Sequence, residues 1–182
     1  MISADKLIKL LGLKPHPEGG YFREAYSSDE MIGKAALPKR YEWNRRNGTA
    51  IFYLLTREAF SAIRRIKTDE VYHFYLGDPV ELTQLLTDGS GRVTMLGNDI
   101  AAGAHVQIVA FAAGAHVQIV VSRGTWHGAQ LVEGGNYALL RTTVSPGFEF
   151  ADFEIRHRTD LTRSYPSFSD SIIALTRSKG LG

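Results

Sequence analysis

Two segments of this sequence carry side chains that can transfer protons or hold a charged ligand. The first, residues 61–79, contains Arg64 and Glu70, and the second, residues 118–128, contains His127. Glutamate and histidine are common general acids and bases in enzymes. A strand, a turn and a second strand would direct these side chains into one barrel, with His127 on the opposite wall. We therefore expect Glu70 and His127 to be the catalytic pair of any acid–base chemistry.

Arg64 restricts the chemistry of this group more than any other residue. A guanidinium stays protonated and has no free lone pair, so it does not ligate a metal. Beside Glu70 it would form an ion pair or hold an anionic group of a ligand. His73 follows Glu70 by three residues, and in a strand this odd spacing places two side chains on opposite faces. His73 is therefore either a pocket residue, if a bulge intervenes, or a packed histidine.

Aromatic and polar residues near the two segments are candidates for the walls of a ligand pocket, since rings with polar tips suit small-molecule sites. The predicted ligand-binding residues are Arg23, Tyr53, Arg64, His73, Tyr75, Gln118 and Trp126. For Tyr53 and Tyr75 a place in the barrel core is an equal alternative. His16 lies in a proline- and glycine-rich turn, residues 14–20, where we expect it to orient the backbone.

The composition excludes several classes of chemistry. The 182 residues include no cysteine, which rules out disulfides, thiol catalysis and thiolate-bound metals, so a metal would need histidines and carboxylates. With 21 basic and 19 acidic residues, the net charge of +2 gives no strong field for nucleic acid or membranes. No segment approaches the roughly 18 apolar residues of a spanning helix, and no signal peptide pattern is present. The cytoplasm is the expected location by default.

Hydrophobic patterning predicts an all-β fold flanked by two helices. Ser3 and Gly12 bound a predicted helix over residues 3–12, and Ser169 would cap a second over residues 169–177. Residues 27–48 are predicted to form a long surface loop with solvated basic side chains. Short apolar runs separated by turn residues are typical of a sandwich or barrel. They cover residues 49–56, 59–66, 71–76, 79–87, 92–96, 116–121, 128–132, 136–145 and 150–157.

A short internal repeat interrupts this pattern. Residues 101–109 and 112–120 are identical, with a period of 11. The repeat indicates that residues 101–111 are a recent tandem duplicate of residues 112–120, or that the recorded sequence contains an error. Because 11 is odd, exchanging the copies would reverse which side chains face inward. We place the strand in the second copy, which leads into His127, and expect the first copy to bulge out.

Four stretches in this order resemble the RmlC-like cupin superfamily, and within it a subfamily of unknown function. They are residues 16–24 (HPEGGYFRE), 69–79 (DEVYHFYLGDP), 122–127 (SRGTWH) and 145–154 (SPGFEFADFE), supported by Leu161 and Tyr165-Pro166. The resemblance implies a double-stranded β-helix, or jelly roll, with a pocket inside the barrel and a homodimer. It also implies one domain over residues 1–182, with a core of about residues 14–166.

The resemblance also bears on metal binding. Metal-binding cupins place two histidines and a glutamate in the first motif and one histidine in the second. Here Glu70 and His127 match, but Ala62 and Arg64 stand where the other histidines would be, and subfamily relatives usually have histidine before Arg65. We therefore predict no cofactor and disfavour a divalent metal. If a metal does bind, we expect its ligands to be Glu70, His73 and His127.

Three functions remain open at this point. The first is binding of a small polar or anionic ligand, similar to a nucleotide or sugar phosphate, in the barrel. The second is a sugar-modifying epimerase or isomerase, with Glu70 and His127 as acid and base and with Arg64 and Arg23 holding an anionic substrate. Related epimerases need a further histidine as base where this chain has Arg64, which weakens that alternative. The third is a metal-dependent cupin enzyme. The expected partners are a small molecule and a second copy of the chain.

Overall fold

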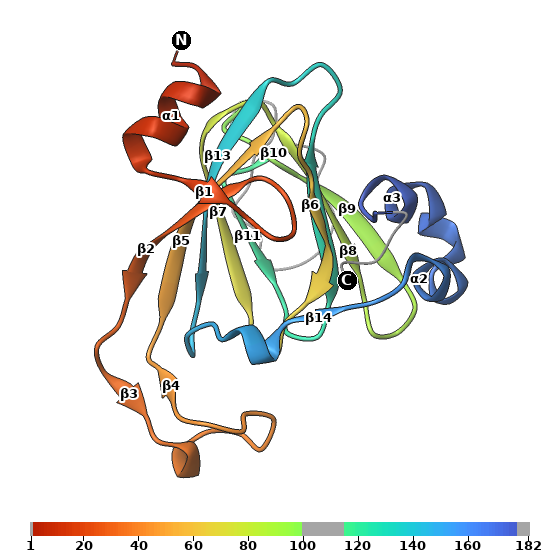
Figure 1. The fold of residues 1–182 in the computed structure, drawn as a ribbon. Coiled ribbons are helices and arrows are strands. Elements are labelled where there is room, and N and C mark those ends of the chain that lie inside the picture. Colours follow the sequence, from red (N-terminus) through yellow and green to blue (C-terminus); the bar gives the residue numbers. More distant parts are fainter. Residues whose placement is uncertain (1, 100–114, 178–182) are drawn as a thin grey trace.

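The computed structural model describes residues 2–99 and 115–177, and in them two six-stranded sheets face each other. Figure 1 shows the sheets as the walls of a barrel, with helices outside them and a two-stranded arm extending from one end. The strands pair antiparallel except β10 and β9, which are parallel. The predicted all-β fold class, with an N-terminal helix and a short helix near the C-terminus, is confirmed.

The first sheet contains the strand that carries Glu70. Its order is β1 (Lys14–Pro15), β2 (Tyr21–Ser27), β5 (Thr49–Thr56), β13 (Tyr137–Val144), β7 (Glu70–Gly77) and β11 (Gln118–Val121). The central strand β13 pairs along its length with both β5 and β7. Glu70 is thereby held opposite Val144, at the end of β7 where the sheet meets the arm.

The second sheet contains the strands that carry Arg64 and His127. Its order is β10 (Ala115–His116), β9 (Gly91–Leu96), β8 (Val80–Leu85), β12 (Trp126–Leu131), β6 (Ser61–Arg65) and β14 (Glu154–Ile155). Arg64 and His127 are direct partners across β6 and β12. The predicted strand over residues 150–157 is wrong for its first half, because Phe150–Asp152 form a 3-10 helix.

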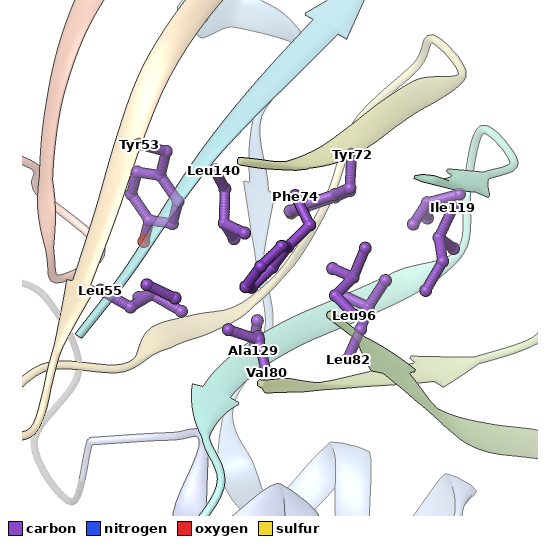
Figure 2. Packing of buried hydrophobic residues seen from close by; sticks show 12 residues of the cluster. Tyr53, Leu55, Tyr72, Phe74, Val80, Leu82, Leu96, Ile119, Ala129 and Leu140 are labelled. Carbon is purple, nitrogen blue, oxygen red and sulfur yellow. The ribbon is translucent and has the colours of Figure 1, made fainter. Parts of the chain in front are cut away.

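Alternation along β7 shows how the core between the sheets is filled. Tyr72 and Phe74 are buried in the core, whereas Tyr75, the next residue, is 43% exposed. The second sheet contributes Val80 and Leu82, both fully buried. Figure 2 shows these side chains meeting between the two sheets. Burial of apolar surface at about 25 cal/mol per Å² makes this packing the main source of stability.

The helices cover the outer faces of the sheets. Helix α1 (Ala4–Leu11) begins at Ser3, whose side chain accepts a hydrogen bond from the Lys6 N–H, and ends at Gly12 in the left-handed conformation, as predicted. Its Leu7 packs with Leu54 of β5 and Leu139 of β13 in a second cluster. None of the helices in the described ranges is long and apolar enough to cross a membrane.

The C-terminal segment contains more helix than the sequence predicted. Helix α2 (Arg158–Ser164) was not predicted, and the 3-10 helix Pro166–Phe168 leads into α3 (Ser169–Ala174). The α3 side chains divide as expected of a surface helix, with Ile172 buried and Ile173 50% exposed. The expected cap is also different, because Ser169 is the first helical residue and its hydroxyl donates to the Pro166 carbonyl.

The region predicted to be a surface loop forms a structured arm. It contains β3 (Met31–Ile32), the 3-10 helix Lys34–Ala36 and β4 (Arg45–Arg46), and β3 pairs with β4. The expected solvation of its basic run is wrong at Arg45, which is 1% exposed and forms a 2.6 Å ion pair with Asp152. The buried ring of Tyr41 lies against the Arg45 guanidinium. A charge pattern alone did not reveal this buried partner.

The internal repeat has a definite place for its second copy. As predicted, the second copy contributes the strands Ala115–His116 and Gln118–Val121. The predicted bulge of the first copy lies outside the described residues, as does His105.

Loss of the Asp152 carboxylate should destabilise the protein strongly. Asp152→Asn should lower the free energy of unfolding by about 3 kcal/mol, because it leaves the Arg45 charge buried without its partner. The matched control is Glu154→Gln, which removes a carboxylate from a pair whose side chains are 37% and 51% exposed. It should cost at most about 1 kcal/mol. Urea unfolding measures both, and equal losses would contradict the structural role of Asp152.

Candidate functional site

A cavity of about 130 Å³ opens at the end of the barrel from which the arm extends. Its inner part is polar and its outer part is largely apolar. The lining residues are His16, Glu18, Phe22, Glu24, Thr49, Ala50, Ile51, Arg64, Ile66, Glu70, Thr142, Val144, Phe148 and Phe150. Glu18, Arg64 and Glu70 are all buried, whereas Phe150 is 67% exposed. The cavity therefore leads from exposed aromatic rings to buried charges.

The turn between β1 and β2 places His16 and Glu18 in the cavity. The His16 N–H donates to the Gly20 carbonyl over 2.9 Å, and the Gly19 N–H donates to the His16 carbonyl over 3.0 Å. Gly19 has φ +111°, and a Cβ there would lie 2.1 Å from the Phe60 carbonyl oxygen, so only glycine fits. The Tyr53 hydroxyl donates to the Gly19 carbonyl over 2.8 Å and fastens the turn to the barrel.

His16 also has a fixed tautomer in this turn. The Glu18 N–H donates to His16 Nδ1 over 3.2 Å. Because Nδ1 accepts, the proton of the neutral ring is on Nε2. Burial and the positive charge of Arg64 lower the pKa of His16 to about 4. His16 is therefore a neutral hydrogen-bond donor at neutral pH.

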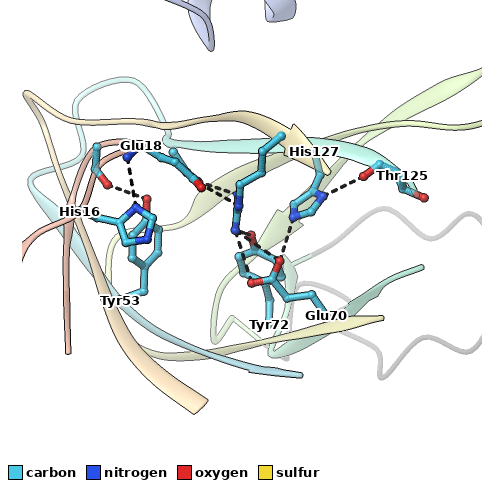
Figure 3. A network of polar contacts seen from close by, with 10 residues as sticks. His16, Glu18, Tyr53, Glu70, Tyr72, Thr125 and His127 are labelled. Atoms are coloured by element: carbon cyan, nitrogen blue, oxygen red, sulfur yellow. Dashed lines mark hydrogen bonds and ion pairs between the residues drawn. The ribbon is translucent and has the colours of Figure 1, made fainter. Parts of the chain in front are cut away.

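The Arg64 guanidinium lies between the two inner carboxylates. Arg64 Nε is 2.8 Å from Glu18 Oε2, and Arg64 Nη2 is 3.3 Å from Glu70 Oε2. The guanidinium also donates to the Tyr72 hydroxyl over 3.0 Å and to Ser61 Oγ over 3.1 Å. Figure 3 shows this network extending from the turn to His127. The guanidinium thus donates hydrogen bonds to three partners and forms an ion pair with a fourth, Glu18, which leaves little of the cation for a ligand.

Glu70 joins Arg64 to His127. His127 Nε2 is 2.9 Å from Glu70 Oε2, and His127 Nδ1 is 3.0 Å from the Thr125 carbonyl oxygen. A carbonyl only accepts, so Nδ1 donates, and the contact with Glu70 requires a further proton between the two side chains. Burial would raise the pKa of Glu70, but Arg64 and the hydrogen bond from His127 outweigh it and lower the pKa to about 2. Glu70 is therefore ionised at neutral pH.

Glu18 differs from Glu70 although both contact the same arginine. Its side chain is 3% exposed, and its Oε2 accepts no hydrogen bond from the described residues despite the nearby Arg64 Nε. Burial raises the pKa of the Glu18 carboxyl to about 7, against the opposing effect of Arg64. An incompletely partnered buried carboxyl that titrates near neutral pH is characteristic of functional sites.

The donor set does not fit a metal ion. Arg64 fills the space between Glu18 and Glu70, and a guanidinium offers no lone pair. Within residues 2–99 and 115–177, no three histidines or acidic residues are grouped to hold a metal. His73, expected to complete the ligand set with Glu70 and His127, alternates with core residues of β7 and contacts Thr143 instead. A metal ion is therefore not part of the chemistry proposed for this site.

Three residues of the predicted site lie in or beside the cavity. Arg64 and Glu70 line it, and His127 supports Glu70 from behind without lining it. The predicted Arg64–Glu70 ion pair is present. Tyr53 takes its core alternative, because it is 3% exposed and packs in the main cluster while its hydroxyl holds the turn.

The other predicted ligand-binding residues lie away from the cavity. Arg23 packs over Phe52 on the outer face of the first sheet, and Tyr75 contacts the same ring. Gln118 pairs with His73 across β11 and β7, on that same outer face. Trp126 is buried in a different cluster under the C-terminal helices, with Arg65 stacked on it. Their residue types suited a pocket, but strand alternation turns them outward.

The sequence pattern did not indicate the residues that complete the cavity. Glu18 and Glu24 were not singled out, and neither were Thr142, Phe148 and Phe150, although all five line the cavity. One signal was available for Glu24: in a strand of period 2 it shares a face with Phe22, which packs against the core. Glu18 lay within the HPEGGYFRE stretch but carried no spacing signal of its own.

Comparisons with known proteins agree with this architecture. The family model described as "Cupin superfamily (DUF985)" matches residues 5–156. The chain belongs to this family. The predicted cupin assignment is confirmed, and the two-sheet barrel is a cupin barrel. No curated protein matches the sequence significantly.

Solved structures resemble this cupin over nearly its whole length. A crystal structure of a Shewanella oneidensis protein is 28% identical, with a TM-score of 0.82, over 98% of this chain and 100% of that one. A hypothetical protein from Leishmania major is also 28% identical, with a TM-score of 0.83, over 97% and 100%. A cupin 2 domain-containing protein from Halorhodospira halophila is 11% identical, with a TM-score of 0.53, over 92% and 89%, which supports the fold alone.

Because the pKa of Glu18 is raised in the folded protein, the contribution of this group to the free energy of unfolding decreases as the pH rises. Its folded-state pKa lies above its ordinary value of 4.5, so from pH 4.5 to about 7 the folded protein binds a proton that the unfolded chain releases. The stability from this group is therefore complete below pH 4.5 and is lost as the pH rises to about 7. The charged groups that act on the Glu18 carboxyl are Arg64, which lowers its pKa, and Glu70, which raises it.

Glu18→Gln should remove this dependence. The free energy of unfolding of the parent protein minus that of the variant should fall by about 1–3 kcal/mol between pH 4.5 and 7. The lowered pKa of His16 acts in the opposite direction between about pH 4 and 6.5, but both proteins contain His16, so it largely cancels. Urea unfolding at pH 4.5, 5.5 and 7 measures the difference. A difference independent of pH would show that Glu18 does not titrate in this range.

Proposed function

We propose that this cupin binds a small polar molecule in the barrel, with an uncharged or cationic group at the inner end. The observation that carries this proposal is Glu18, a buried carboxyl facing the cavity whose Oε2 has Arg64 as ion-pair partner but no hydrogen bond within the described residues. A ligand hydroxyl or amine would supply the missing donor. Unsatisfied buried acceptors cost about 1–3 kcal/mol, which such a ligand would recover.

The balance of charges argues against an anionic ligand. Three carboxylates line the cavity, those of Glu18, Glu24 and Glu70, against the single guanidinium of Arg64. Arg64 already contacts two of them. A phosphate would compete with these carboxylates and be repelled by Glu24. Of the two ligand types expected from the sequence, the polar uncharged one therefore has more support than a nucleotide or sugar phosphate.

The mouth of the cavity adds an apolar contact. Phe148 and Phe150 pack edge to face, with ring centroids 5.2 Å apart, and both line the cavity with Phe22. Exposed aromatic rings at a cavity entrance offer a surface for the less polar side of a ligand. Glu24 beside them would favour a positive charge over a negative one at this end.

Glu70 and His127 support the site in this proposal and do not act as its acid and base. Glu70 is held ionised by Arg64 and His127, and its two neighbours use its oxygens. His127 has both ring nitrogens engaged and is 1% exposed. We infer that this pair fixes the position of Arg64, which leaves Glu18 as the carboxyl that meets a ligand.

A thermal-shift screen tests the chemistry of the ligand. Uncharged polyols and monosaccharides, small amines and inorganic phosphate are added separately, each at millimolar concentration. At a concentration ten times Kd, a ligand stabilises the folded state by about 1.4 kcal/mol and raises Tm by roughly 3–5 °C. We expect such shifts with polar uncharged or cationic compounds and none with phosphate. Stabilisation by phosphate alone, or by no class at all, would overturn the proposal.

Two aromatic substitutions distinguish ligand binding in the cavity from ligand binding on the outer face of the barrel. Phe150→Ala should weaken binding of a compound found in the screen at least fivefold and change stability little, because Phe150 is 67% exposed. Tyr75→Ala is the matched control, since Tyr75 is also partly exposed but lies outside the cavity. Calorimetric titration measures both affinities. A larger loss with Tyr75→Ala would place the ligand on the outer face.

A further inference from the structure

The turn at residues 16–20 brings together two groups that could transfer a proton, which ligand binding alone does not require. Glu18 is a buried carboxyl with an unsatisfied oxygen, and His16 is a ring whose Nδ1 is occupied. Both line the same cavity. They are adjacent in space because the Glu18 backbone N–H itself donates to the His16 ring. One short turn thus supplies a proton acceptor and a neutral hydrogen-bond donor.

We propose that Glu18 and His16 catalyse proton transfer at a carbon next to a carbonyl group, on a small uncharged α-hydroxy aldehyde or ketone. This inference rests on the proposed function, since the substrate would occupy the same cavity. It assigns the acid–base role to residues other than Glu70 and His127.

The proposed reaction is balanced without any other reagent. The Glu18 carboxylate takes the proton from the carbon, and the electron pair of the broken C–H bond forms a carbon–carbon double bond. The carbonyl oxygen becomes an enolate oxygen that accepts a hydrogen bond from His16 Nε2–H. The Glu18 carboxyl then exchanges its proton with solvent and returns a solvent proton to the same carbon, which gives hydrogen exchange. The proton can also return to the neighbouring carbon while the hydroxyl proton moves to the enolate oxygen, which gives isomerisation.

The surroundings of the two residues suit these roles. A neutral histidine stabilises an enolate by donating a hydrogen bond and still keeps its proton, and a glutamate is a common partner base. The pKa values of His16, lowered to about 4, and of Glu18, raised to about 7, are consistent with this division. Arg64 Nε, 2.8 Å from Glu18 Oε2, holds the carboxyl in place and adds positive charge near the enolate.

The size and charge of the cavity restrict the substrate. A cavity of about 130 Å³ admits a molecule of few carbon atoms. Three carboxylates along its wall disfavour a phosphorylated or carboxylated substrate. Thr142, which also lines the cavity, hydrogen-bonds to Glu70 and so belongs to the fixed wall. Short uncharged sugars and hydroxyketones meet these requirements.

Hydrogen–deuterium exchange measured by proton NMR tests the proposal directly. The protein is incubated in D2O with hydroxyacetone, dihydroxyacetone or glyceraldehyde, and the signal of the proton next to the carbonyl is followed. The intact chain should accelerate its loss at least tenfold over buffer for one of these probes. Glu18→Gln should return the rate to that of buffer, and His16→Gln should lower it at least tenfold. Glu133→Gln, an exposed turn residue outside the cavity, is the matched control and should exchange like the parent.

Two further measurements keep the test decisive. The exchange rate of the parent should rise with pH through an inflection near 7, which a merely structural Glu18 would not produce. If Glu18→Gln does not fold, Glu18→Asp keeps a base but withdraws it by one methylene, and should lower the rate at least tenfold without loss of Tm.

Exchange at the parent rate in a folded Glu18 variant would overturn the proposal, as would a lack of acceleration with all three probes. A probe that raises Tm without exchanging refutes catalysis but leaves the binding function intact.

Discussion

The buried guanidinium of Arg64 is the charge on which the arrangement of the site depends. It links the turn, through Glu18, to both sheets, through Glu70 and its own strand β6. Removing several charged groups from water costs several kcal/mol per ion, and mutual attraction compensates only if each ion has partners. Arg64 without its carboxylates, or the carboxylates without Arg64, would be severely unfavourable. The geometry of the cavity floor is therefore fixed by charge as much as by packing.

Sharing one cation between two carboxylates also explains why they differ. Glu70 has a second partner in His127, whereas the described residues give the Glu18 carboxyl only the guanidinium. The better-partnered carboxyl is held ionised, and the other is left responsive to pH. This difference arises from the positions of Glu70 and Glu18 in the fold, since the two side chains belong to the same residue type. Figure 3 shows that the contacts of Glu70 continue to His127 and from there to Thr125.

The fold could be predicted from the sequence because its signals are local and periodic. The apolar run over residues 49–56 predicted β5 as it stands. Of the two alternatives left by the odd spacing of Glu70 and His73, the structure shows opposite faces. The site could be predicted only in part. Arg64 and Glu70 were found, but Glu18 was not, because its role depends on a turn whose Gly19 carbonyl accepts a hydrogen bond from Tyr53 on the distant strand β5.

The residues that were misplaced share one physical cause. Trp126 and Tyr75 have the chemistry of pocket residues, and only the register of their strands decides which way they face. Register is set by pairing between distant segments, which the order of residues along the chain does not reveal. Buried partners such as Arg45 and Asp152, which are far apart in sequence, were missed for the same reason.

The pair formed by Arg45 and Asp152 also gives the arm a mechanical connection to the cavity. Arg45 belongs to β4 of the arm, and Asp152 ends the 3-10 helix that begins at Phe150. Phe150 is one of the exposed rings at the cavity mouth. A short, buried ion pair resists stretching, so displacement of the arm pulls on the segment that bears this ring. The ion pair therefore connects the arm to the entrance of the barrel, and a force on one is transmitted to the other.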